Sequence, residues 1–151
     1  MPGAPSSGPR PAPEPALTPN WNADPAGWHE SLDYLFGVDL FNAGFCWESH
    51  EALEVVWKQL RAADQTLAAT FVQSIIQVAA ARLKRETGEE VGVARLHSRA
   101  ASNIAPALST HTPIMGVDAE AWWPECETWF ASAGRNADPP NLTLRTPPPQ
   151  A

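Results

Sequence analysis

Apolar residues recur every three or four positions through the central part of the chain, the spacing of one buried face of an α-helix. We expect four helices, at about residues 28–42, 45–62, 66–86 and 91–108. In a fifth segment, 118–133, Pro124 disfavours an unbroken helix, so one or two helical pieces are expected. No alternating strand pattern is present. The sequence therefore predicts an all-α fold, a compact array or up-and-down bundle of four to five helices.

Two of these segments also predict which side chains face the core. Apolar spacing places five residues on the inner side of the first helix: Leu32, Leu35, Phe36, Asp39 and Leu40. Gly44 is expected to end that region as the glycine after a helix C-terminus. Near the other end, Trp122, Cys126 and Trp129 follow the i, i+4, i+7 spacing of a stripe that packs on the bundle.

Proline gathers at both ends of the 151-residue chain, which has 16 prolines. Proline supplies no backbone donor and interrupts helices and ladders. We therefore expect a disordered Pro-rich arm at residues 1–27, a helical domain at 28–137 and a disordered Pro-rich tail at 138–151.

Net charge limits the classes of partner. The chain carries a formal charge of -7 and a pI near 5.0, which argues against nucleic acid and anionic membranes as partners. The longest apolar stretch, 67–81, is interrupted by polar residues and is short for a membrane span. Cys46 and Cys126 are expected to be free thiols. The N-terminus lacks a basic and apolar signal, so we expect a cytoplasmic protein.

The second predicted helix concentrates the candidate chemistry. At about 100° per residue, its core arc holds four apolar side chains: Leu53, Val56, Trp57 and Leu60. His50 and Glu54 lie one turn apart beside that arc, so both are expected to be partly buried and to need a partner. Gln73 and Gln77, one turn apart on the third helix, are candidate hydrogen-bonding partners.

The same region resembles the domain-of-unknown-function family 309. Two motifs carry the resemblance: L-F-N-x-G at residues 40–44 and E-x-H-E-x-x-E-x-x-W at residues 48–57. Further matches are Q-S-I-I-Q at 73–77 and G-V-A-R-L at 92–96. The resemblance covers about residues 36–100, and the function of the family is unassigned. It implies a helical array and a characteristic site with five members: Glu48, His50, Glu51, Glu54 and Trp57.

The first functional hypothesis is a metal site. Imidazole and carboxylate groups at i, i+4 can share one Zn, Mn or Fe ion, which makes His50 and Glu54 the candidate ligands and a metal-dependent hydrolase a conceivable activity. The helix lacks the second histidine of a zincin motif, and a third ligand would have to come from His97, His111 or a carboxylate.

Three other hypotheses stay open. Metal-free acid/base catalysis could use His50 and a carboxylate beside Trp57. Alternatively, an acidic rim of Glu48 and Glu51 could bind a basic protein partner or a second copy of the chain. A structural network of His50, Glu54, Gln73 and Gln77 would have no function beyond fixing the helices. Binding or interaction is the preferred function, and the sequence does not decide whether the protein is an enzyme.

Overall fold

The computed structural model describes residues 15–132 and 134–145, and regular structure in these ranges is helical apart from one isolated bridge between Ile114 and Val117. The predicted all-α class is confirmed. The elements are a 3-10 helix η1 (Pro25–Glu30) and the α-helices α1 (Leu32–Asn42), α2 (Cys46–Ala62), α3 (Thr66–Glu86), α4 (Glu90–Ser109) and α5 (Ala119–Ser132).

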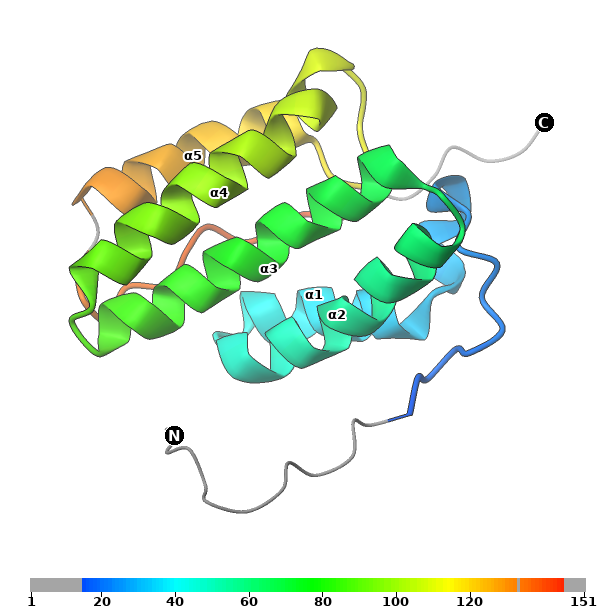
Figure 1. Cartoon of the computed structure of the whole chain (residues 1–151), viewed down its shortest axis with the longest axis horizontal. Coiled ribbons are helices and arrows are strands. Elements are labelled where there is room, and N and C mark those ends of the chain that lie inside the picture. Colours follow the sequence, from blue (N-terminus) through cyan, green and yellow to red (C-terminus); the bar gives the residue numbers. More distant parts are fainter. Residues whose placement is uncertain (1–14, 133, 146–151) are drawn as a thin grey trace.

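Consecutive helices pack against each other, from α1 on α2 through to α4 on α5. Figure 1 shows α2, α3 and α4 side by side at the front, with α1 behind α2 and α5 behind α4. The segment after α5 runs back behind α3 toward α1. The result is a helical array in which, among the described residues, no helix covers one face of α2.

The predicted first helix is divided at Ser31. Its backbone is extended, with φ -88° and ψ 105°, and its hydroxyl accepts a hydrogen bond from the Tyr34 amide, as an N-cap does. Residues before this break form η1. At the other end of α1, Gly44 has φ +87°, a left-handed conformation that glycine adopts without strain, as predicted for a glycine that ends a helix.

The predicted inner face of α1 is wrong in part. Leu32 and Phe36 are 52% and 50% exposed, whereas the buried residues are Asp33, Tyr34, Gly37, Val38 and Phe41. Apolar side chains surround this helix on all sides, so their spacing cannot select a face. Close packing selects the buried face instead. Gly37 lies so near α2 that a Cβ atom at this position would be 2.7 Å from the Leu53 side chain.

One continuous helix forms α5 despite Pro124. Trp122, Cys126 and Trp129 are all buried, which confirms the predicted stripe. Arg85 of α3 donates hydrogen bonds to two carbonyls in the last turns of α5, those of Trp129 and Phe130, each at 2.7 Å. These contacts stabilise the helix C-terminus.

Contacts at both ends extend beyond the predicted 28–137 domain. The Leu17 and Thr18 amides donate to the Asp33 carboxylate, and Leu142 is buried against the bundle. Residues 15–27 and 138–145 therefore pack on the helices, where we expected disordered arms, because their backbone groups find partners in the domain. The remaining parts of the predicted arms, 1–14 and 146–151, lie outside the described residues.

Helix α3 is long and apolar enough to cross a bilayer by length and composition. The sequence had led us to expect that residues 67–81 are too short and too polar for a membrane span. More than half of the most apolar stretch of α3 is buried between neighbouring helices. The core helix of a soluble protein has the same properties, so this is weak evidence for a membrane span.

Candidate functional site

Core packing and one hydrogen bond fix the orientation of α2. Its buried face includes Leu53, Val56 and Leu60, three of the four predicted core residues, whereas Trp57 is half-buried. Ser49 is also buried, and its hydroxyl donates to the Gly37 carbonyl of α1 at 2.8 Å. This bond and the core contacts direct the opposite face of α2 to solvent.

That solvent face carries a regular stripe, here called the outer stripe. Its five members are spaced four, three, four and three residues apart, the repeat of one helix face: Trp47, Glu51, Glu54, Lys58 and Arg61. Trp47 is 57% exposed. Along the stripe, charge changes from acidic near the middle of α2 to basic at its C-terminal end. The sequence prediction missed Trp47 and Arg61, although the spacing opposite Leu53 and Val56 could have indicated them.

His50 lies at the edge of this stripe, next to Glu54, which belongs to it. The distance from His50 Nε2 to Glu54 Oε1 is 3.9 Å, too long for a hydrogen bond. Their side chains are 25% and 42% exposed. The imidazole stacks on Trp47 with ring centroids 5.8 Å apart and an interplanar angle of 3°. The stacked rings of Trp47 and His50 therefore lie next to the Glu54 carboxylate.

Two buried nitrogens of the site have no hydrogen-bond partner within the described residues: His50 Nδ1 and Trp57 Nε1. Arg61 covers the Trp57 ring at 5.3 Å from its centroid without accepting from the indole N–H. A buried donor or acceptor left unpaired costs about 1–3 kcal/mol. Two such atoms about two turns apart on one helix therefore carry an energetic cost that a new partner would relieve.

The predicted glutamine partners do not bond the site. Gln77 Oε1 instead accepts from Asn103 Nδ2 of α4 at 2.8 Å. In the described ranges, no hydrogen bond joins Gln73 or Gln77 to His50 or Glu54. Asn103 was not among the predicted site residues, because sequence alone does not show which residue of α4 faces α3. Glu48 lies in the first turn of α2 and is exposed.

Two other histidines pair elsewhere. His97 Nε2 lies 2.9 Å from Glu127 Oε2, and His111 Nδ1 lies 3.0 Å from Glu120 Oε2, so each binds a carboxylate of α5. Neither was found to join His50 as a third ligand. Over the part of the chain that the structure describes, no group of three His, Cys, Asp or Glu side chains could hold a metal ion.

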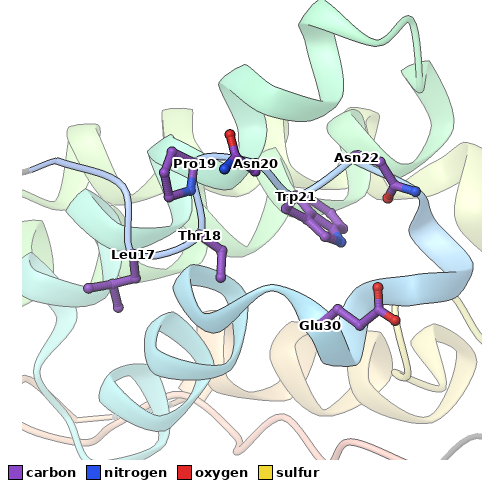
Figure 2. Close-up of a pocket in the computed structure, with 7 residues that line it drawn as sticks. All are labelled: Leu17, Thr18, Pro19, Asn20, Trp21, Asn22 and Glu30. Atoms are coloured by element: carbon purple, nitrogen blue, oxygen red, sulfur yellow. The ribbon is translucent and has the colours of Figure 1, made fainter.

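A surface hollow lies apart from the predicted site. It is lined by Leu17, Thr18, Pro19, Asn20, Trp21, Asn22 and Glu30. Figure 2 shows the chain arching from Leu17 to Asn22 over one side of the hollow, with Glu30 of η1 on the other. The Trp21 indole donates to the Gly27 carbonyl at 3.1 Å, so its polar atom is already used. The hollow belongs to the packing of the N-terminal segment on the domain.

A family model described as "Domain of unknown function (DUF309)" matches residues 34–96. The predicted family is confirmed over this segment. The DUF309 segment covers most of α1, all of α2 and α3 and the start of α4, and so contains every predicted site residue from Glu48 to Gln77. No curated protein and no solved structure matches the chain. The family description itself names no activity.

Proposed function

We propose that the outer stripe of α2, with His50 and Trp57 beside it, is a binding site for a polypeptide segment. The protein would then act as an interaction module, in line with the preferred sequence hypothesis. The observation that carries this proposal is a pair of buried nitrogens beside the outer stripe, His50 Nδ1 and Trp57 Nε1, which have no hydrogen-bond partner in the described residues.

The side chains define what such a segment would contain. Glu51 and Glu54 favour a lysine or arginine, and the exposed Trp47 indole offers a flat apolar surface for a proline or an aliphatic side chain. Backbone carbonyls of the bound segment would supply acceptors for the Trp57 indole N–H. Since that nitrogen is buried, the indole must rotate to reach them, so binding should change the environment of Trp57.

The structural-network hypothesis has less support. It requires hydrogen bonds between His50, Glu54 and the two glutamines, and in the described residues Gln77 bonds Asn103 instead. A network in which the imidazole has an unpaired nitrogen would lower stability. The geometry around α2 therefore favours a site that a ligand completes.

Selection from a displayed peptide library against the full-length chain tests the proposal. We expect enriched peptides to carry a basic residue next to proline or aliphatic residues. Their affinity should fall at least tenfold in Trp47→Ala and Glu54→Gln. The exposed carboxylate of α5, in the variant Glu125→Gln, is the matched control and should leave the affinity unchanged. Failure to enrich any peptide, or equal binding to all four proteins, would refute the proposal.

A metal ion is the second candidate ligand. Two ligands of one zinc ion, each about 2.0–2.2 Å from it, lie about 3–4 Å apart, and the His50 to Glu54 separation of 3.9 Å fits this range. Further ligands would have to come from water or a partner. Titration calorimetry with Zn, Mn and Fe(II) should then show binding that His50→Ala and Glu54→Gln abolish and His29→Ala retains. Hydrolase assays become meaningful only after that result.

A further inference from the structure

We propose that the outward side of α1 is a second interaction surface, which binds a basic amphipathic helix of a partner protein. This surface, here called the α1 face, is separate from the outer stripe of α2. The inference therefore goes beyond the proposed function and can fail independently of it.

The α1 face is apolar although it is exposed. Leu32, Phe36 and Leu40 follow one another at intervals of four residues, so they line one side of the helix. The core uses a different side, where Gly37 packs against Leu53 of α2. Leu32 and Phe36 are 52% and 50% exposed, and Leu40 is half-buried. Among the described helices, none covers this side of α1, which explains why its apolar spacing did not select a core face.

Two further residues extend the apolar row beyond the ends of α1. The Leu17 amide donates to Asp33 Oδ1 at 2.9 Å, which holds Leu17 at the N-terminal end. The Phe45 amide donates to the Leu40 carbonyl at 2.9 Å, which holds Phe45 at the C-terminal end. Both residues are 54% exposed. A half-exposed phenylalanine leaves about 100 Å² accessible, so the row falls within the roughly 300–600 Å² of the largest apolar patches on soluble monomers, which are often functional.

The charges around the α1 face indicate the kind of partner. Residues 15–57 contain seven Asp and Glu residues and no Lys or Arg, although the whole chain has ten Lys and Arg residues. Asp39, three residues after Phe36, is exposed on the face itself, and Glu30 and Glu48 are exposed beside its two ends. In the described part of the chain, none of these three carboxylates forms an ion pair. Lys and Arg side chains on a partner would complement them.

The same charges disfavour two other occupants. In a symmetric dimer the α1 face would meet the carboxylates of its own copy, and an anionic membrane would be repelled in the same way. The shape of the face favours a helix, because side chains at i, i+4 and i+8 form a ridge that packs into a groove of another helix. Leu32 and Leu40 lie about 12 Å apart along α1, close to the 10.5 Å, approximately, between i and i+7 anchors of a bound amphipathic helix.

A designed peptide tests the proposal with the full-length chain. The probe is a helix of leucine and lysine, about five turns long, with all leucines on one face and a label for fluorescence anisotropy. We expect it to bind one to one, with an affinity that falls at least tenfold in Phe36→Ser and in Leu32→Ser. Val91→Ser changes an exposed apolar side chain of α4 and is the matched control. Asp39→Lys should weaken binding, whereas Glu125→Lys, with the same change in net charge, should not. Circular dichroism checks that each variant is folded.

Three results would overturn the inference. The two serine variants of α1 could bind the peptide as tightly as Val91→Ser, or the same peptide with glutamate in place of lysine could bind equally well. Alternatively, sedimentation could show a dimer of the unaltered chain that Phe36→Ser dissociates, which would make a second copy the occupant.

The variant Glu54→Gln separates this failure from failure of the proposed function. It should weaken the peptides selected for the outer stripe and leave the affinity of the leucine–lysine helix unchanged. If Glu54→Gln weakens the leucine–lysine helix and Phe36→Ser does not, that helix binds the outer stripe, and only the inference about the α1 face fails.

Discussion

Asn42 and Leu142 exchange two hydrogen bonds: Asn42 Nδ2 donates to the Leu142 carbonyl at 2.8 Å, and the Leu142 amide donates to Asn42 Oδ1 at 2.7 Å. The two residues are a hundred positions apart. Asn42 belongs to the L-F-N-x-G motif of the DUF309 segment, so one motif residue has a structural role, which is to hold the segment after α5 against the end of α1. This separates it from the motif residues on the solvent face of α2.

Replacing Asn42 by alanine should therefore destabilise the fold. The change removes both bonds and leaves the backbone groups of buried Leu142 without this partner. We expect a loss of about 1–3 kcal/mol in the free energy of unfolding, measured by urea denaturation. Asn141→Ala, at an exposed neighbouring position, is the control and should change stability by less than about 0.5 kcal/mol. Equal stability of the two variants would contradict this role for Asn42.

Arg85 should be similarly sensitive because its guanidinium is buried. It donates to the Trp129 and Phe130 carbonyls and lies 4.4 Å from the Trp129 ring centroid. Lysine cannot make the same forked contact. We expect Arg85→Lys to lower the free energy of unfolding by about 2 kcal/mol or more. The exposed Arg95→Lys is the control, and a similar loss in both would show that the forked contact contributes little.

The two thiols should react slowly in the folded protein. Burial raises the pKa of Cys46 to about 11, and burial also raises the pKa of Cys126. Thiolates react and thiols do not, so a thiol reagent at pH 8 should modify both cysteines only after unfolding by urea. Equally fast modification of the folded protein would contradict their burial.

The raised pKa of Cys46 also predicts a loss of stability in alkali. Below its ordinary pKa of 9.0 the thiol is protonated in both states. Between about pH 9 and 11 the unfolded chain releases the proton first, so unfolding becomes more favourable as pH rises. We expect Cys46→Ala to reduce this slope when unfolding is measured at pH 8, 9.5 and 11. An unchanged slope would assign the loss to other buried groups, such as Tyr34.

The fold was largely predictable because helical spacing is a local signal. The range 66–86 matches α3, and the core positions Leu53, Val56 and Leu60 on α2 are buried as expected. The spacing did not orient α1, which is apolar on all sides, and its exposed Leu32 and Phe36 were assigned to the core.

Contacts between distant segments were not predictable. Proline content indicated disorder for residues 138–145, but Leu142 is buried and Asn42 bonds its backbone. At the site, helix spacing placed His50 beside Glu54 correctly. It could not reveal that Gln77 bonds Asn103, because that pairing depends on how α4 lies against α3.

The most direct test of the proposed binding site is the indole N–H signal of Trp57 in NMR spectra of the full-length chain, with and without a selected peptide. The indoles of Trp122 and Trp129 already donate to the Pro140 and Ala137 carbonyls and serve as internal controls. We predict that the Trp57 proton moves downfield as its nitrogen gains an acceptor, while the two control signals stay in place. A Trp57 signal that does not move at saturating peptide, or that moves no more than the controls, would contradict the account.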